Sequence, residues 1–368
     1  MARRSIVLSV FVLFSCACSN GASSNSVAQP TDAGASTVDC VGDSATIDTT
    51  CGSLGWSQSS TDSRPRNHHL SVIAQTSSGA FLYSVGGVDN DSPIANVDRA
   101  PINADGSLGA FTELTAIPRA TGGMTGAIVN NVIVFAGGSR GAAVTDQAYS
   151  AVINSDGSLG AWNSAGSVVS FRMHPASIVS GSTMFVLGGF NDPNVWDDIV
   201  SANVSADGTV SAWASAGKLP GPRSHFSSTL HAGYIYIAGG LDKSAFQSSP
   251  PLATVFEGKI LADGTIGNWT SMPSLPEGVC THASFFYGGY LYLGGGLGTS
   301  AYKILDKVWR SPIGADHSLG AWEEVAPLGV ARGHVHQFPV LGNHVYSVGG
   351  AITLDLKSTS EIDVGVFQ

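Results

Sequence analysis

Six pairs of adjacent glycines, each at the end of an apolar stretch, divide the chain at nearly equal intervals. The pairs are Gly86-Gly87, Gly137-Gly138, Gly188-Gly189, Gly239-Gly240, Gly294-Gly295 and Gly349-Gly350, with spacings of 51, 51, 51, 55 and 55 residues. An aromatic residue recurs with a similar period, at Trp56, Phe111, Trp162, Trp213, Trp269 and Trp322. A fixed period of about 50 residues indicates repeated structural units that stack or close into a ring.

Each period alternates between strand-like and turn-like stretches. One unit has apolar runs at 225–230 and 234–237, the second of which ends in Gly239-Gly240. A third run, such as 149–153, leads into an Asp-Gly pair. That pair favours a tight β-hairpin because both residues tolerate positive φ. The aromatic residue begins a fourth strand and supplies a large apolar body for packing between units. The unit therefore predicts four antiparallel strands.

The two ends of the chain predict how the units join. Trp56 precedes any set of three strands, whereas the last set, 333–367, has no aromatic strand after it. A leading strand that pairs with the last set would complete it and remove the open sheet edges. The predicted fold is all-β, a six-bladed β-propeller with four antiparallel strands per blade, closed by the N-terminal strand in the C-terminal blade.

The glycine pairs and the tryptophan strands resemble the kelch-repeat family over residues 51–368. Two features depart from the general kelch pattern: the Asp-Gly-Ser-Leu-Gly-Ala hairpins at 105–110 and 156–161, and Phe111 in place of tryptophan. The resemblance implies a ligand-binding face of variable loops over the central channel, since variable loops on a rigid scaffold usually carry the binding residues.

The first 18 residues predict a secretory signal. Arg3 and Arg4 precede a short apolar core, which is too short to span a bilayer. The sequence Leu-Phe-Ser before Cys16 resembles the lipobox of bacterial lipoproteins, which implies a lipid-anchored protein of the bacterial cell envelope. Cys18 is the weaker candidate for lipidation, and plain secretion is the alternative. Residues 19–50 read as a flexible tether, and 51–368 as the propeller.

Three further cysteines bear on the compartment. Export to an oxidising compartment favours a Cys40–Cys51 disulfide, with two reduced thiols as the alternative. Cys280 lies in an apolar run and reads as a buried thiol.

Charge excludes one class of partner. The chain has 17 Lys and Arg against 27 Asp and Glu, a net charge of −10. Nucleic-acid binding needs a basic face, so we expect no nucleic-acid partner. We also expect a monomer with no cofactor and no metal. A shared zinc site is disfavoured because ligands from separate blades should lie too far from one metal ion.

Counting from the aromatic marker, Arg recurs at the tenth position and His at the twelfth in four of the six units. These residues are Arg66, His68, Arg172, His174, Arg223, His225, Arg332 and His334. The second unit has Arg119 nearby, and the fifth has Glu277 and His282. Residues two apart on a strand share a side, so this set predicts a channel mouth suited to an elongated anionic or polyhydroxylated ligand. The alternative is structural, with the arginines bonded to carbonyls of the scaffold and the histidines packed within it.

Three functions remain open on this sequence. The first is a binding module for a cell-envelope protein or glycan. The second is a sugar-acid mutarotase or epimerase, in which Glu277 is the general acid and base and Arg223 or Arg332 holds the carboxylate. The third is a structural surface protein without a small ligand. The sequence favours the first over an enzyme.

Overall fold

A computed structural model describes residues 53–244, 250–299 and 303–368, all within one compact unit of the chain. These residues form β-strands and turns and contain no helix. Accordingly, the described part holds no helix of the length and apolarity needed to cross a membrane. The predicted Cys40–Cys51 disulfide and the candidate lipidation sites Cys16 and Cys18 lie outside the described residues.

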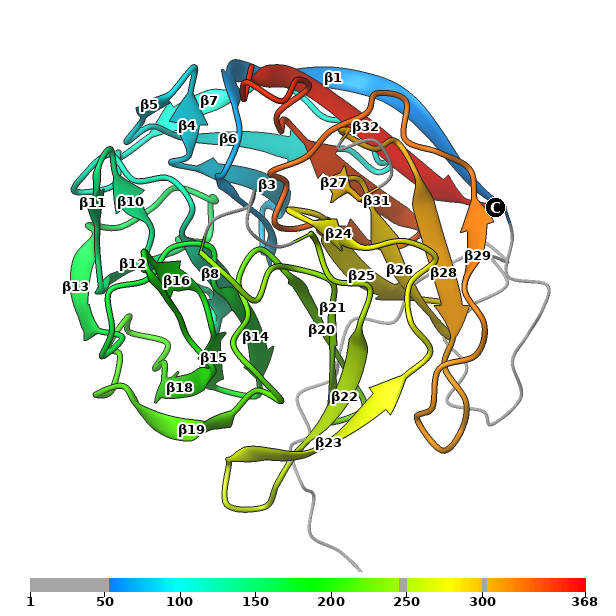
Figure 1. Cartoon of the computed structure of the whole chain (residues 1–368). Helices are drawn as coiled ribbons and strands as arrows, with labels where there is room; N and C mark the ends of the chain where they lie inside the picture. Colours follow the sequence, from blue (N-terminus) through cyan, green and yellow to red (C-terminus); the bar gives the residue numbers. More distant parts are fainter. Residues whose placement is uncertain (1–52, 245–249, 300–302) are drawn as a thin grey trace, which may run out of the picture. The chain divides into compact units, whose positions relative to one another are not determined.

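Half of the described strands form four-stranded antiparallel sheets, which are arranged around a common centre (Figure 1). One sheet consists of β2 (Leu70–Thr76), β3 (Gly79–Val85), β6 (Val97–Ile102) and β7 (Thr112–Leu114). The next consists of β8 (Thr125–Val129), β9 (Val132–Ala136), β12 (Gln147–Val152) and β13 (Asn163–Ser167). A later sheet consists of β25 (Ala283–Tyr287), β26 (Tyr290–Gly294), β28 (Val308–Pro312) and β29 (Glu323–Val325).

An eight-stranded sheet lies between them in the sequence and divides into two antiparallel halves. The first half is β14 (Ala176–Ser180), β15 (Thr183–Leu187), β18 (Asp198–Asn203) and β19 (Ala214–Lys218). The second half is β20 (Ser227–His231), β21 (Tyr234–Ala238), β22 (Val255–Ile260) and β23 (Ile266–Met272). A single parallel pairing between Gly217 and Ile266 joins them. Each half therefore repeats the four-stranded pattern.

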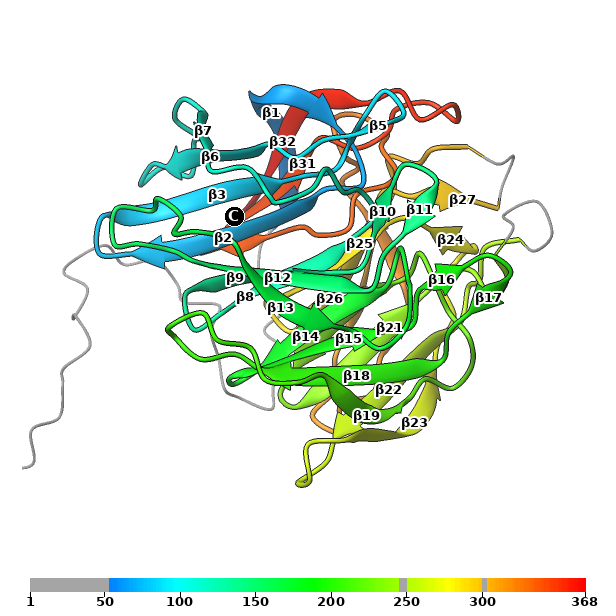
Figure 2. The same cartoon turned by 90° about the vertical axis from the view of Figure 1, so that its left-hand side faces the viewer.

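The remaining four-stranded sheet combines the two ends of the described chain. It consists of β30 (Val340–Leu341), β31 (His344–Val348), β32 (Thr359–Phe367) and β1 (Leu54–Arg66). β1 runs antiparallel to β32, with Trp56 opposite Gly365. The two strands lie side by side in both views (Figures 1 and 2).

Three short ribbons extend from the loops that follow glycine pairs, and a fourth joins such a loop to the segment that precedes a first strand. They are β4 (Val88–Asp89) with β5 (Ser92–Pro93), β10 (Ser139–Arg140) with β11 (Ala143–Val144), β16 (Phe190–Asn191) with β17 (Asn194–Val195), and β24 (Val279–Cys280) with β27 (Leu297–Gly298). Bridges such as Asn67 to Val88 and Met173 to Phe190 join these loops to the segments that precede the first strands. Both kinds of loop thus share one face, as predicted, and we call it the loop face. The opposite side carries the hairpin turns and is called the turn face.

The glycine pairs allow neighbouring sheets to approach closely. The N–H of Gly138 donates to the carbonyl of Arg172, 2.8 Å away, and the N–H of Gly350 donates to the carbonyl of Arg66 at the same distance. Gly138 and Gly350 have φ of +97° and +102°, where a side chain is strained. A Cβ on Gly350 would lie 2.9 Å from a Val335 methyl group. Glycine is therefore required for this contact.

The fifth pair was assigned to the wrong residues by sequence. Gly294 ends β26, and the residues with positive φ are Gly295 and Gly296, whose N–H groups bind Lys307 and Arg332 carbonyls. Three consecutive glycines hide the strand end, because apolar patterning cannot choose between two overlapping pairs.

The aromatic markers pack between sheets, and four of the tryptophans bond to the preceding repeat. The indole N–H groups of Trp162 and Trp213 donate to the carbonyls of Thr115 and Ala165, at 3.0 and 2.9 Å. Trp322 makes the equivalent bond to Pro273. The apolar clusters between sheets follow the same rule, since the cluster around Tyr83 in β3 also holds Phe135 in β9. Each unit buries apolar surface against its neighbour, as expected for repeats.

Candidate functional site

The four arginines of the predicted site are buried and bind the backbone of the scaffold. Each Nη1 donates to the carbonyl of the first glycine of a pair. These bonds join Arg66 to Gly86 (3.1 Å), Arg172 to Gly188 (2.8 Å), Arg223 to Gly239 (2.6 Å) and Arg332 to Gly349 (2.7 Å). The guanidinium groups therefore satisfy carbonyls at the strand ends where the chain turns.

Carboxylates on the third strands compensate three of these charges. Asp98, Asp198 and Asp363 pair with Arg66, Arg172 and Arg332, respectively. Asp62 also lies 2.9 Å from Arg66. Arg223 instead donates to the Thr254 hydroxyl, and burial lowers its pKa to about 10. These contacts match the alternative interpretation, in which the arginines bond to the scaffold. A contact between these arginines and a ligand stays a prediction.

The twelfth-position residues meet through their backbones. The N–H of His68 donates to the His334 carbonyl (3.0 Å), and the N–H of His225 donates to the His174 carbonyl (3.0 Å). Gly123 continues the series between His68 and His174, and Thr281 extends it from His225. The four histidines have φ between +52° and +55°. The sequence register thus picked out positions that form one chain of hydrogen bonds across the repeats.

The imidazole rings of these residues cluster with a fifth histidine. We call His68, His174, His225, His334 and His336 the histidine layer. Ring centroids lie 4.0 Å apart for His68 and His334 and for His174 and His225, and 4.8 Å apart for His68 and His174. His336 lies 5.4 Å from His174. At these separations the rings are in contact, so sequence reasoning grouped four of the five and missed His336.

The histidine layer is uncharged at neutral pH. Burial lowers the pKa of His334 to about 3 and that of His336 to about 4. Burial, followed by the neighbouring histidines, lowers the pKa of His68, His174 and His225 well below the ordinary value. The histidines therefore add no positive charge to the channel. The described residues also contain no group of His, Cys, Asp or Glu arranged to hold a metal ion.

The outlying predicted residues do not share one environment. Arg119 is exposed on the loop before β8. Glu277 is largely buried, and its carboxylate lies 3.7 Å from the Lys307 ammonium. His282 is buried and its pKa is lowered to about 3. For the mutarotase alternative, Arg332 would have to release Asp363 before it could hold a substrate carboxylate. Cys280 is buried, and burial raises the pKa of its thiol to about 12, as expected of an inert thiol.

Sequence reasoning missed an exposed apolar turn on the loop face. The N–H of Ser170 donates to the Val168 carbonyl (2.8 Å), and Val169 between them has a φ of +71°. This is a strained γ-turn, rare for a β-branched residue. It leaves Val169 63% and Phe171 52% exposed. A signal existed: Pro118, Pro220 and Pro276 occupy the position of Val169 in other repeats, and proline cannot adopt that φ.

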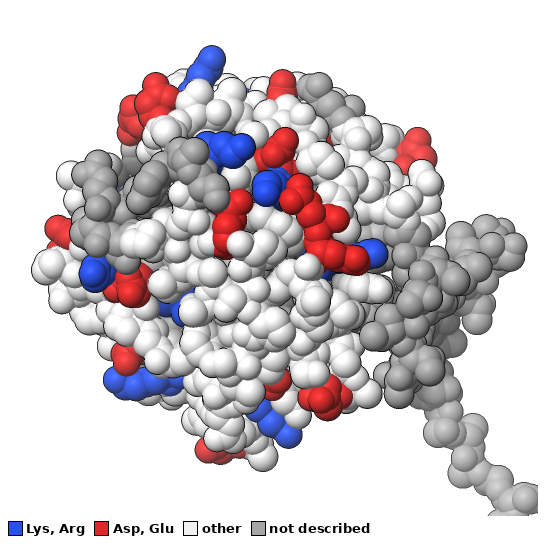
Figure 3. Space-filling view, turned by 45° about the vertical axis from the view of Figure 1, so that its right-hand side comes forward, with Lys and Arg blue, Asp and Glu red and all other residues white. Residues whose placement is uncertain are grey.

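Charge is sparse around the described surface. The face in Figure 3 is mostly uncharged, with lysines, arginines and carboxylates scattered singly or in small mixed groups. Several of these charges are paired: Lys307 with Glu324 and Arg310 with Glu323. This face offers no basic surface of the kind nucleic acid requires.

Four-stranded antiparallel sheets with paired glycines, joined around a common centre, define a propeller-like repeat protein. The profile of the KLHDC2/KLHL20/DRC7 Kelch-repeats domain matches residues 115–350, more than half of the chain. The chain belongs to the kelch-repeat family.

Individual proteins show the same relationship at lower similarity. Kelch-like protein 36 of Bos taurus is 26% identical over 52% of this chain and 29% of its own length. Alpha-scruin of Limulus polyphemus is 24% identical over 54% of this chain and 21% of its own. The chain therefore spans less than a third of these relatives. The structure titled "Structure of YjhT" matches with a TM-score of 0.65 at 13% identity, covering 84% of this chain and 99% of that one, which supports the fold alone.

Proposed function

We propose that this protein is an exported interaction module: a closed six-bladed kelch propeller, lipid-anchored at Cys16, that binds a cell-envelope protein through its loop face. Kelch-repeat proteins typically act as protein-interaction modules. The pairing of β1 with β32, and the bond from Gly350 to Arg66, support a closed ring. The apolar signal core and the lipobox-like residues before Cys16 support export and anchoring.

The exposed γ-turn is the observation that carries the choice of partner. Val169 and Phe171 are two of the three large apolar side chains that are exposed among the described residues, and they stand two positions apart. When a partner covers an exposed apolar side chain, apolar surface leaves water, and this burial stabilises the complex. Backbone strain at exposed sites often marks a functional segment. A protein partner, rather than a hydrophilic glycan, fits an apolar contact of this kind.

The proposed binding face is tested by crosslinking in the native host. A photo-crosslinking phenylalanine analogue replaces Phe171 in the full chain, and the same analogue replaces Ser78 on the turn face as the control. We expect a discrete adduct with one envelope protein at position 171 and none at position 78. Identical products at both positions, or none at either, would contradict loop-face binding.

Anchoring is tested separately by metabolic labelling with a fatty-acid analogue. We expect label in the wild-type chain and in Cys18→Ala, and none in Cys16→Ala. Label that survives Cys16→Ala but disappears in Cys18→Ala would move the anchor to Cys18, and an unlabelled wild type would mean plain secretion.

A further inference from the structure

We propose that the cavity between the first strands of the repeats binds a neutral cyclic polyol of monosaccharide size, which enters from the turn face. This site is on the opposite side from the proposed protein-binding face and uses none of its residues. The inference therefore goes beyond the proposed function and stands or falls independently of it.

The cavity is built from six different stretches of chain. It has a volume of about 350 Å³ and is lined by residues of β2, β8, β14, β20 and β25 and by residues 336–339. This volume lies within the range of about 300–1,000 Å³ typical of small-molecule sites. Each repeat contributes one wall, and the cavity between these walls is partly open to solvent.

The walls alternate between hydroxyl and apolar side chains along the strands. Ser71, Ser177, Ser228, Ser284 and Gln337 form one lining layer. Two residues further along the strands, Ile73, Ile128, Val179 and Leu230 form the next. Residues two apart on a strand face the same side, so both layers face the same space. A cyclic polyol matches this pattern, because it has hydroxyl groups at its edge and C–H groups on its faces.

The histidine layer adjoins the cavity at its loop-face end. His336 lines the cavity, and its Nε2 is buried without a hydrogen-bond partner. Nδ1 of His174 and Nδ1 of His334 are also buried and unpartnered. Unpaired buried nitrogens are costly, and a ligand hydroxyl would satisfy the one that lines the cavity. The contacts between the imidazole rings obstruct the axis at this end.

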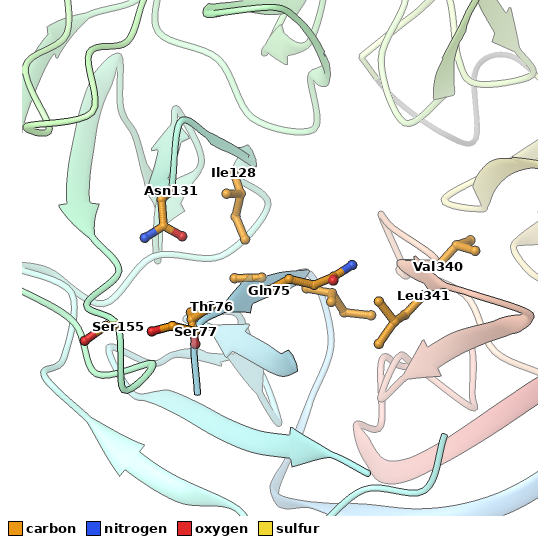
Figure 4. Close-up of a pocket in the computed structure, with 10 residues that line it drawn as sticks. Gln75, Thr76, Ser77, Ile128, Asn131, Ser155, Val340 and Leu341 are labelled. Atoms are coloured by element: carbon orange, nitrogen blue, oxygen red, sulfur yellow. The ribbon is translucent and has the colours of Figure 1, made fainter. Parts of the chain in front are cut away.

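The opposite end opens at the hairpin turns. A second cavity of about 610 Å³ shares Ile73 and Ile128 with the first and so adjoins it. Turn-face residues line it, among them Gln75, Ser77 and Asn131, with Val340 and Leu341 across from them (Figure 4). Gln75 and Ser77 are exposed to solvent. The route into the cavity between the first strands therefore begins on the turn face.

The absence of charged lining residues sets the chemical class of the ligand. Neither cavity is lined by an Asp, Glu, Lys or Arg among the described residues. A charged ligand would lose hydration there without gaining an ionic partner, which is strongly unfavourable. The lining serine hydroxyls already have partners in the scaffold: those of Ser177 and Ser228 donate to backbone carbonyls, and those of Ser71 and Ser284 bond to His69 and Thr229. Their oxygens can still accept a hydrogen bond from a neutral polyol, and Gln337 and His336 offer further polar groups.

Calorimetric titration of the full chain tests the ligand class. The neutral probes are D-glucose, D-galactose and myo-inositol, and the charged counterparts are D-glucuronate and D-glucosamine. We expect saturable one-to-one binding of at least one neutral probe, and at least tenfold weaker binding of both charged counterparts. No binding of any neutral probe, or equal affinity for a charged one, would overturn the proposal.

Matched tryptophan substitutions test the location. Gln75→Trp obstructs the turn-face mouth at an exposed residue, and Ser92→Trp places the same bulk at an exposed residue of the loop face. We expect Gln75→Trp to weaken binding at least tenfold and Ser92→Trp to leave it unchanged. The opposite pattern, or no effect of Gln75→Trp, would refute this site. Phe171→Ser should weaken binding of the envelope partner while sugar binding persists, so the two proposals can fail separately.

Discussion

At the scale of single residues, the buried arginines act as connectors between strand ends. Arg332 shows this most clearly, because its Nη1 bonds three backbone carbonyls (Ser347, Gly349 and Glu361) and its Nη2 bonds the Asp363 carboxylate at 2.8 Å. Both side chains are fully buried. Removing one partner leaves the other charge unpaired in the interior, and breaking such a pair typically costs about 3–5 kcal/mol.

We predict that Arg332→Ala lowers the free energy of unfolding by about 3–5 kcal/mol in urea titration. The exposed Arg119→Ala serves as the matched control and should change it by less than about 0.5 kcal/mol. Arg332→Met combined with Asp363→Leu should recover much of the loss, since no unpaired charge remains. An Arg332→Ala variant as stable as Arg119→Ala would show that the ion pair does not hold the strands.

A second residue-scale prediction concerns the glycine that contacts the first repeat. Gly350→Ala forces a side chain into φ +102° and against Val335, so it should cost about 1–3 kcal/mol of stability. Gly55→Ala is the control, because no atom lies within 4 Å of a Cβ at Gly55. Thermal unfolding measures both variants, and we expect a lower midpoint for Gly350→Ala. Equal unfolding midpoints for the two variants would refute the steric argument.

At the scale of elements, β1 covers an edge that would otherwise be open. Residues from Leu54 to Thr61 pair with residues 361–367 of β32, and Arg66 pairs with Thr359. An exposed edge strand is a template for association with another chain. The strand also supplies Leu54 and Trp56 to the apolar cluster around Phe285 and Phe338.

We predict that a chain beginning at residue 62, which keeps Asp62 and Arg66 but loses the paired residues from Leu54 to Thr61, unfolds at lower temperature and self-associates. A chain beginning at residue 53 is the control. Thermal unfolding and light scattering measure the two effects. A truncated chain that stays monomeric with an unchanged midpoint would argue against β1 as the closing strand.

At the scale of the whole molecule, the histidine layer makes stability depend on pH. Its histidines stay neutral in the folded protein because burial lowers their pKa, to about 4 for His336 and about 3 for His334. In the unfolded chain they titrate near pH 6.5. Below that pH the unfolded state binds more protons, so the free energy of unfolding falls as pH falls from about 6.5 towards 4.

We predict a loss of roughly 2 kcal/mol between pH 7 and pH 5 for each histidine that remains neutral in the folded state. Urea titrations at the two pH values measure this loss. His336→Gln should show a smaller difference between pH 7 and pH 5 than the wild type. A wild-type protein whose stability is unchanged or higher at pH 5 would contradict the neutral layer.

The amino-acid sequence alone predicted the repeat, the four-stranded unit and the loops that share a face. These follow from local patterns: glycine pairs at strand ends, Asp-Gly turns and alternating apolar residues. It also determined the register of the arginines and histidines, because equal spacing from the tryptophans places equivalent residues at equivalent points of each unit.

The contacts that those residues make follow instead from packing between segments that are distant in the chain. Arg172 turns inward because Asp198, on a strand 26 positions later, faces it, and His336 joins the layer although it lies outside the twelve-residue register. The γ-turn at Val169 and the cavity between the first strands likewise arise from contacts among distant segments. Such contacts depend on how the sheets pack, and a local pattern holds no information about the side chains that packing brings opposite one another.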